Sequence, residues 1–447
     1  MSVLAGARRM PVFRALAVRD FRLLWASEAV SVVGDQFHLI ALSWLVISLT
    51  GSGLALGTVL IAVGVPRALL IVPLGVLADR RPARGLMLAA HLARGGIVGV
   101  IAVLAAIGAA SIPVLAVLGV LFGAADALYM PAQQAFLPRT VEPERLPSAN
   151  ALLQGTLQLS AIIGPPAAGV LIAIAGTSAA FAVDAVSFAV AAILVAVISS
   201  AARAAITGPA APAAADLGSG LSGQLASPAA APESPESFRA ALMGGLRYVA
   251  TDPAIRTMML ISFVLNFAFS GPGAVGAPWL ASQRFAAGPT GLGLMEAGWA
   301  AGALIGILAA GSVRLDRQGR VILAGLAVSG SAMALVGVLY WLPGVIVMLA
   351  VMGVAIGYTN IIAVSWLQAR VDPGMVGRVM ALVMLMSFGI TPLSIGVAGA
   401  LVDVNATAMF VGSGALVLLT TVGALAARFP QLFDAPAPIL ERAEGAA

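Results

Sequence analysis

The sequence contains neither cysteine nor lysine, and only two of its 447 residues are histidine. Without cysteine the chain can form no disulfide bond and no thiolate metal site. Two histidines are too few for the imidazole clusters that hold catalytic zinc, so we expect no metal and no other cofactor. No nucleophile–base arrangement and no nucleotide-binding glycine loop is visible. The sequence therefore predicts neither an enzyme nor direct coupling to ATP.

Charged residues are also scarce. They make up 10% of the chain, whereas hydrophobic residues make up 60%. A soluble protein has about 25% charged residues, so this chain has too few to cover a surface that faces water. The composition therefore indicates an integral membrane protein. The first apolar segment is preceded by no signal-peptide core or cleavage site, so we expect it to remain as a span.

Twelve apolar segments reach or exceed the length of about 20 residues that a spanning helix needs. A stretch rich in alanine, proline, serine and glycine divides them into two sets of six, and this composition is typical of a flexible linker. The predicted spans are 23–49, 54–77, 86–108, 112–136, 149–174, 178–200, 255–281, 290–311, 321–342, 344–368, 379–401 and 406–427.

The basic residues are all arginines, and they gather in alternate loops, while loops such as AASIP and WLPG lack them. By the positive-inside rule both termini and the linker lie in the cytoplasm, in a multi-pass protein of the inner (plasma) membrane. The basic excess is thus a topology signal, and we expect no nucleic-acid partner. The predicted regions are a cytoplasmic N-terminal segment (1–22), a six-helix bundle (23–200), a cytoplasmic linker (201–254), a second six-helix bundle (255–427) and a cytoplasmic tail (428–447).

The two sets of spans repeat each other. GVLADRRPAR at 75–84 aligns with GSVRLDRQGR at 311–320, and VEP at 141–143 aligns with VDP at 371–373. Because both copies have the same orientation in the membrane, the repeat is a parallel one, with an axis along the membrane normal. The expected fold is therefore all-α, with twelve transmembrane helices in two parallel-repeat six-helix bundles.

The loop at 75–84 carries a pattern of glycine, leucine, aspartate and basic residues that resembles the signature loop of the major facilitator superfamily. The matching residues are Gly75, Leu77, Asp79, Arg80 and Arg84. The resemblance implies the major facilitator fold, alternating access and a cytoplasmic gate at this loop. Asp79 would face the positive end of a helix, and the arginines would reach Glu142 or Glu144 in one state. The alternative is a basic loop that only sets topology.

A second motif, GPPAAG at 164–169, resembles the Gly-Pro-x-x-Gly-Gly motif of the family's antiporters. Gly164, Pro165 and Gly169 match it, and Ala168 replaces a glycine. Stretches at 33–57 and 131–152 are similar to the branch that contains macrolide-efflux proteins and the enterobactin exporter. The resemblance covers nearly the whole chain.

Several ionisable residues lie inside the predicted spans, where a charge costs from ~3 kcal/mol upward. Asp35 and Arg67 have the same expected depth, near the midplane, which predicts an ion pair between them. Glu28, Ser31, Asp35 and His38 are spaced by 3, 4 and 3, so they share one helical face that could line water or a solute. The alternative is that Asp35 and Arg67 only staple two helices together.

If that pair is tight, Asp126 in span four or Glu296 in span eight would carry the proton instead. We expect Arg94, with its neighbour His91, to extend to the cytoplasmic surface. His38 is either a packed residue or a proton relay. The candidate residues of the proton and substrate cavity are Glu28, Asp35, His38, Arg67, Asp126 and Glu296.

The sequence thus predicts a secondary active transporter that works by alternating access. Its expected function is proton-coupled efflux of lipophilic or amphiphilic small molecules, and the runner-up is export of a siderophore or metabolite. A membrane sensor or scaffold that moves nothing is an alternative of another class. The expected partners are a small-molecule substrate, protons and membrane lipids, and we expect a monomer.

Overall fold

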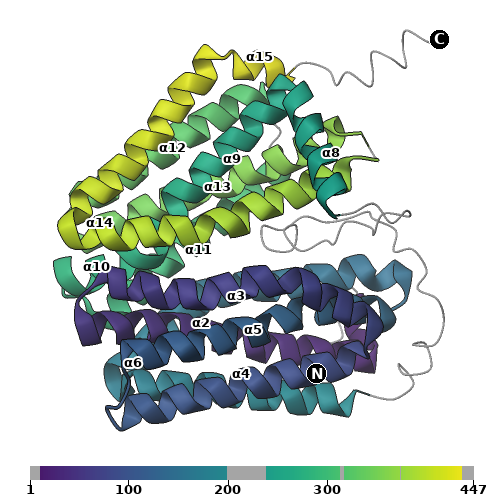
Figure 1. Cartoon of the computed structure of the whole chain (residues 1–447), viewed down its shortest axis with the longest axis vertical. Coiled ribbons are helices and arrows are strands. Elements are labelled where there is room, and N and C mark those ends of the chain that lie inside the picture. Colours follow the sequence, from purple (N-terminus) through teal and green to yellow (C-terminus); the bar gives the residue numbers. More distant parts are fainter. Residues whose placement is uncertain (1–10, 199–237, 313–316, 373, 435–447) are drawn as a thin grey trace. The chain divides into compact units, whose positions relative to one another are not determined.

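A computed structural model describes residues 11–198, 238–312, 317–372 and 374–434 of the chain, without the side chains of a few residues such as Asp79. These residues form helices and no strands (Figure 1). Inside hydrocarbon every backbone amide must be satisfied within the protein, and a helix does this within one segment. The predicted all-α class is confirmed.

The first half of the chain forms long apolar helices joined by short turns. Most boundaries fall within a few residues of the predicted spans. After η1 (Pro11–Ala17) come α2 (Arg19–Thr50), α3 (Gly53–Arg80), α4 (Ala83–Ala106), α5 (Ile112–Phe136), η2 (Leu137–Arg139), η3 (Pro143–Arg145) and α6 (Leu146–Val197).

Helix α6 is two spans rather than one. It has 52 residues, which at 1.5 Å per residue is roughly 78 Å, more than twice the thickness of the hydrocarbon core. Gly176 interrupts it with φ 80° and ψ 172°, a backbone conformation that glycine adopts without steric cost. The break separates the predicted fifth and sixth spans.

The second half begins with a helix that the sequence analysis placed in the linker, α8 (Phe238–Thr251). Asn405, with φ −160° and ψ 96°, divides α14 as Gly176 divides α6. The other elements are α9 (Pro253–Gly271), η6 (Pro272–Gly276), α10 (Ala277–Trp279), η7 (Leu280–Arg284), α11 (Gly288–Ser312), α12 (Gln318–Val338), α13 (Leu342–Arg370), α14 (Val376–Ala426) and α15 (Phe429–Asp434).

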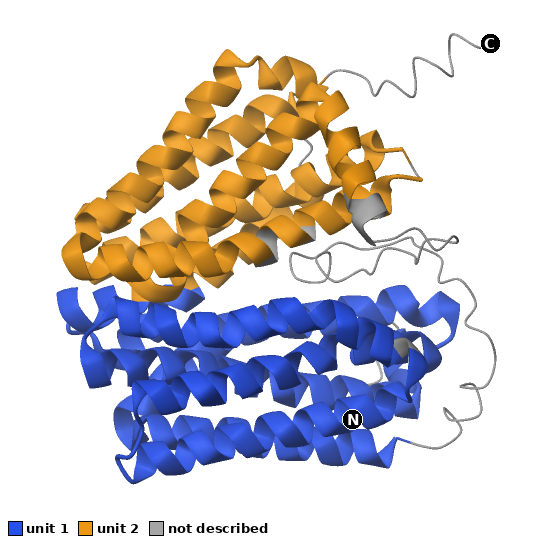
Figure 2. Cartoon of the chain, in the orientation of Figure 1, with its two compact units in different colours: residues 1–218, 278–297 blue, residues 219–277, 298–447 orange. Residues whose placement is uncertain are grey.

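Ten helices in the described ranges are long and apolar enough to cross a membrane. Since α6 and α14 each contain a break, the described chain supplies the twelve spans that the sequence predicts. The chain forms two compact units, residues 1–218 with 278–297 and residues 219–277 with 298–447 (Figure 2). The predicted boundary at the linker stays a prediction.

Glycines set the closest helix pairs in each unit. A Cβ on Gly123 of α5 would lie 2.0 Å from the carbonyl oxygen of Val63 in α3. In the second unit, a Cβ on Gly302 of α11 would lie 2.0 Å from the carbonyl oxygen of Ala350 in α13. Small residues let membrane helices approach this closely. The same pairing, the second span with the fourth, thus occurs in both units.

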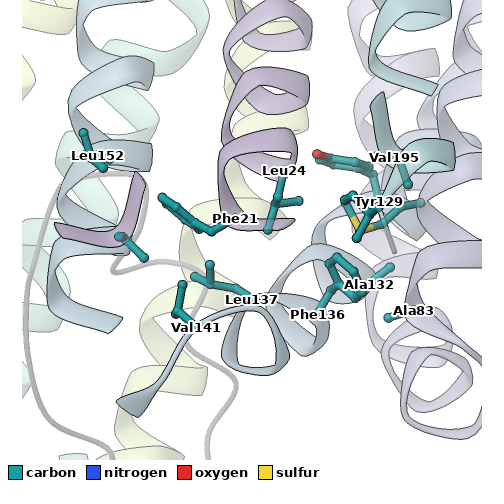
Figure 3. Close-up of a cluster of buried hydrophobic side chains, with 14 of the residues drawn as sticks. Phe21, Leu24, Ala83, Tyr129, Ala132, Phe136, Leu137, Val141, Leu152 and Val195 are labelled. Carbon is teal, nitrogen blue, oxygen red and sulfur yellow. The ribbon is translucent and has the colours of Figure 1, made fainter. Parts of the chain in front are cut away.

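Each unit also has a cluster of buried hydrophobic side chains. In the first unit Phe21, Phe136 and neighbouring residues pack below Tyr129, which lies at the edge of the cluster (Figure 3). In the second unit the Trp366 ring stacks on Phe433 of α15, with 4.4 Å between centroids. The predicted tail therefore contains a helix that is part of the packed unit.

Candidate functional site

Three helices of the first unit bring two arginines to one carboxylate. Arg94 Nη1 of α4 lies 2.8 Å from Asp126 Oδ1 of α5, and Arg67 Nη1 of α3 lies 3.1 Å from Asp126 Oδ2. The Arg94 side chain is 2% exposed and that of Arg67 is 37% exposed. A charge at membrane depth is tolerated where it is paired. Here both arginines pair with the carboxylate of Asp126.

The predicted pair of Asp35 with Arg67 is wrong, because Arg67 binds Asp126. An equal expected depth in the membrane does not decide which neighbouring helix a side chain meets. Gly123 lets α5 lie directly against α3 at Val63. One helical turn further along each helix, the same contact brings Asp126 and Arg67 together.

Arg94 does not extend to the surface, which corrects a second expectation. Its guanidinium carbon lies 4.5 Å from the centroid of the Tyr129 ring and 4.4 Å from that of Phe188, as in cation–π contacts. Its Nη2 lies 3.2 Å from Nδ1 of His91, which is also buried. Arg94 Nε and His91 Nε2 have no hydrogen-bond partner among the described residues. The carboxylate and the two rings replace the water that Arg94 would reach by extending outward.

Glu28 of α2 also belongs to the cluster around Arg94 and Asp126. The Tyr129 hydroxyl donates a short hydrogen bond to Glu28 Oε2. In Figure 3 that hydroxyl end points towards α2. Glu28 makes no ion pair within the described ranges, although it interacts electrostatically with Arg94 and Asp126. Its carboxylate is thus held by a neutral phenol.

Asp35 also has no ion-pair partner in the described part of the chain. It interacts electrostatically with Arg94, and with the carboxylates of Glu28, Asp126 and Asp184. Asp35 and Glu28 therefore share the Arg94 cluster without a cation of their own.

His38 contacts both α6 and α5. Its Nδ1 lies 3.3 Å from Asp184 Oδ2 of α6, but neither atom has a hydrogen bond of acceptable geometry among the described residues. The ring stacks on Phe122 with 4.6 Å between centroids. Gly34 permits this contact, because a Cβ there would lie 2.0 Å from Ser187 Oγ. The predicted polar stripe therefore meets two helices, with His38 between Asp184 of α6 and Phe122 of α5, and Glu28 bonded to Tyr129 of α5.

Glu296 lies in α11, within the segment that belongs to the first unit. It is half-buried and forms no ion pair with a described residue. Its role in proton binding stays a prediction.

The predicted gate loop shows different contacts from those expected. Arg84 Nε donates to the carbonyl oxygen of Val195 at 3.0 Å, and its Nη2 donates to that of Ala196. These carbonyls end α6, so Arg84 caps that helix. Glu142 pairs instead with Arg145, at 3.1 Å. Arg80 is exposed, and the side chain of Asp79 lies outside the described part.

Gly75 of this loop does not serve a close helix approach in the structure, because no described atom lies within 4 Å of the position of a Cβ. The glycines of GPPAAG do serve close approach. A Cβ on Gly164 would lie 2.6 Å from Gln36 Cβ of α2. One on Gly169 would lie 2.4 Å from the carbonyl oxygen of Pro289, and Thr290 Oγ1 donates to the Gly169 carbonyl at 3.4 Å. The motif is a packing surface on α6.

Nothing in the sequence singles out Tyr129, and the expected place of Arg94 is the surface. A signal for Arg94 was present, since it lies eight residues after the predicted start of a span at residue 86, roughly 12 Å along the helix. Tyr129 gave no such signal, because a tyrosine in an apolar helix is usually a packed residue.

Comparison with known proteins places these features in a family. The sequence profile of the Major Facilitator Superfamily matches residues 24–394. Macrolide efflux protein A of Streptococcus pyogenes is 23% identical over 373 residues, which cover 81% of this chain and 84% of that protein. The multidrug efflux pump Tap of Mycolicibacterium fortuitum is 26% identical, covering 83% and 86%.

Among solved structures, a bacterial homologue of the iron transporter ferroportin, in an inward-facing state, has the same fold. Its TM-score is 0.69 with 17% identity, covering 93% of this chain and 99% of that chain. The profile match, the twelve apolar spans and the shared fold agree: the chain is a multi-pass membrane transporter that belongs to the Major Facilitator Superfamily.

Proposed function

We propose that this transporter exports lipophilic or amphiphilic small molecules in exchange for protons. The observation that carries the proposal is the excess of carboxylates in the first unit. Glu28, Asp35 and Asp126 meet only two arginines, and both arginines bind Asp126. With all five ionised, one negative charge is left over at membrane depth, where it costs from ~3 kcal/mol upward.

A proton on Glu28 or Asp35 removes that excess charge. Asp126 already forms ion pairs with both guanidinium groups. Glu28 and Asp35 have no such cation, so they are the acids that can exchange a proton for a substrate. Tyr129 would keep the Glu28 side chain in place in either state, since its hydroxyl can both donate and accept.

The direction of transport and the substrate class rest on other grounds. The relatives named as efflux proteins are 23% and 26% identical to this chain, which supports export as a working assignment. The spans offer few charges to a strongly polar solute, which favours a lipophilic or amphiphilic one. Export of a siderophore or another metabolite is the second candidate.

A sensor or scaffold with this fold is less well supported. A protein that moves nothing has no use for two carboxylates without cations inside its spans, because each lowers stability. The GPPAAG packing surface supports exchange with protons through its partial match to the antiporter motif.

The test is transport by the purified protein in liposomes, over a panel of macrolides, cationic dyes and siderophores. We expect accumulation that needs a pH gradient and stops when a protonophore removes it. The double variant Glu28→Gln/Asp35→Asn should lose pH-driven transport by tenfold or more. Its matched control is Glu142→Gln, an exposed acid of a loop. Full pH-driven transport by the double variant would remove these acids from the mechanism.

A further inference from the structure

Helix α8 has one face firmly packed on the second unit. Val249 is buried in a cluster with Val379 and Leu382 of α14. A Cβ on Gly245 would lie 3.1 Å from Leu382 Cδ1, so the helix lies close to α14. The backbone amide of Asp372 donates to the Tyr248 hydroxyl at 3.1 Å. These contacts fix which side of α8 faces outward.

The outward side is apolar with a basic residue. Met243 is 43% exposed and Leu246 is 49% exposed, and Arg247 and Ala250 are exposed as well. Positions 243, 246, 247 and 250 follow helical spacing, so they form one stripe. The sequence of α8, FRAALMGGLRYVAT, contains two arginines and no acidic residue. The stripe is therefore suited to a surface that is both apolar and negatively charged.

The place of α8 in the chain brings this stripe to the edge of the membrane. Only Asp252 separates it from α9, a spanning helix, and Asp252 Oδ1 accepts from the Ala254 amide at 2.8 Å to begin that helix. With 14 residues, roughly 21 Å, α8 is too short to cross the core of about 30 Å. It runs across the direction of the long helices of its unit (Figure 1).

We propose that α8 lies in the headgroup region of the bilayer and binds anionic phospholipids. Met243 and Leu246 enter the boundary between headgroups and acyl chains, at the depth of roughly 5–10 Å that amphipathic helices reach. Arg247, next to Leu246 in the chain and on one edge of the stripe, binds lipid phosphate while its methylene groups lie against the acyl chains. The contact ties the start of α9 to the membrane surface.

The absence of cysteine makes the immersion of α8 directly measurable, because any introduced thiol is the only one. Nitroxide labels at Met243→Cys and Leu246→Cys are placed in the full chain in lipid nanodiscs. Glu142→Cys, 66% exposed in a loop, is the water reference, and Leu419→Cys, 70% exposed in a span, is the lipid reference. Relaxation by oxygen reports lipid, and relaxation by a water-soluble nickel chelate reports water.

We expect both α8 labels to lie between the two references, with nickel accessibility at least threefold below that of residue 142. Nickel accessibility equal to that of residue 142 would overturn the proposal, because α8 would then lie in water. Labels shielded from both reagents would also overturn it, since protein and not lipid would cover the stripe.

The lipid class is tested by comparing phosphatidylcholine nanodiscs with discs that contain one third phosphatidylglycerol. With anionic lipid, nickel accessibility at Leu246→Cys should fall at least twofold further. Adding Arg247→Gln should abolish that difference, whereas the control Arg145→Gln, in a loop of the first unit, should leave it intact. An equal depth in both lipids, or a difference that survives Arg247→Gln, would overturn the assignment to anionic lipid. None of these readings depends on a transported substrate.

Discussion

At the scale of the residue, the central feature is one carboxylate between two arginines. Asp126 is the only ion-pair partner of both Arg67 and Arg94 in the described part of the chain. Removing it leaves both arginines without an ion-pair partner among the described residues, whereas removing Arg67 leaves the buried pair with Arg94 intact.

Asp126→Asn should therefore destabilise the protein by ~3–5 kcal/mol, the effect of breaking a buried pair from one side. Arg67→Gln should cost under ~1 kcal/mol, because Arg67 is 37% exposed. Thermal unfolding of the two variants in detergent shows which one loses more stability. Equal losses for the two variants would contradict this, because removing Arg67 alone would then cost as much as removing the partner of both arginines.

The contact of Tyr129 with Glu28 is tested by a double-mutant cycle. Tyr129→Phe removes the donor and should lower stability by ~1–3 kcal/mol, because the half-buried carboxylate loses its hydrogen-bond donor. Glu28→Gln and the double variant complete the cycle, and we expect a coupling of at least ~0.5 kcal/mol. Strict additivity of the two changes would mean that the hydroxyl does not hold Glu28.

Residue patterns give an expected depth but do not choose partners. From the intervals along the sequence, Arg67 is expected near the midplane and Asp126 in the fourth span. The choice of Asp126 over Asp35 depends on how α3 and α5 are rotated about their axes, which the glycines decide. That rotation is a property of packing between segments about 60 residues apart, and a local pattern does not record it.

At the scale of the element, the close packing of α3 on α5 depends on glycine at position 123, which has no side chain. Gly123→Ala would put a methyl group 2.0 Å from the Val63 carbonyl oxygen, so the helices must separate. We expect a loss of ~1–3 kcal/mol from the strain, measured by thermal unfolding.

The matched control is Gly99→Ala in α4, where no described atom lies within 4 Å of the new Cβ. Because alanine is the better helix former, this change should be neutral or stabilise by ~0.5–1 kcal/mol. A similar loss for both variants would mean that glycine acts through the helix backbone and not through the α3–α5 contact.

Hydropathy predicted the elements that cross the membrane and missed those that do not. α8 and α15 are short and contain too little apolar sequence for a span, so they were assigned to the linker and the tail. Their positions are fixed by tertiary contacts. For α15 these are the stacking of Trp366 on Phe433 and the hydrogen bond that the Gly319 amide donates to Asp434 Oδ1 at 3.1 Å. Such contacts leave no periodic signal in a sequence.

At the scale of the whole molecule, the orientation inferred from the arginines can be measured with single cysteines. Glu142→Cys should react with a membrane-impermeant maleimide only in inside-out vesicles, because its loop is one of the basic, cytoplasmic ones. Trp341→Cys, exposed in the arginine-free loop WLPG, should react in intact cells. The opposite labelling would reverse the predicted orientation of both termini.

The break in α6 has a mechanical consequence. Gly176 is the only residue in α6 outside helical geometry, so the fifth and sixth spans are joined there with no slack. Two helices joined by a single residue cannot separate at that end, so a displacement of one helix at Gly176 also displaces the other. The fifth span carries GPPAAG and the sixth carries Asp184 against His38. We therefore expect a displacement of the fifth span at its glycine surface to move the sixth span and its Asp184–His38 contact as well.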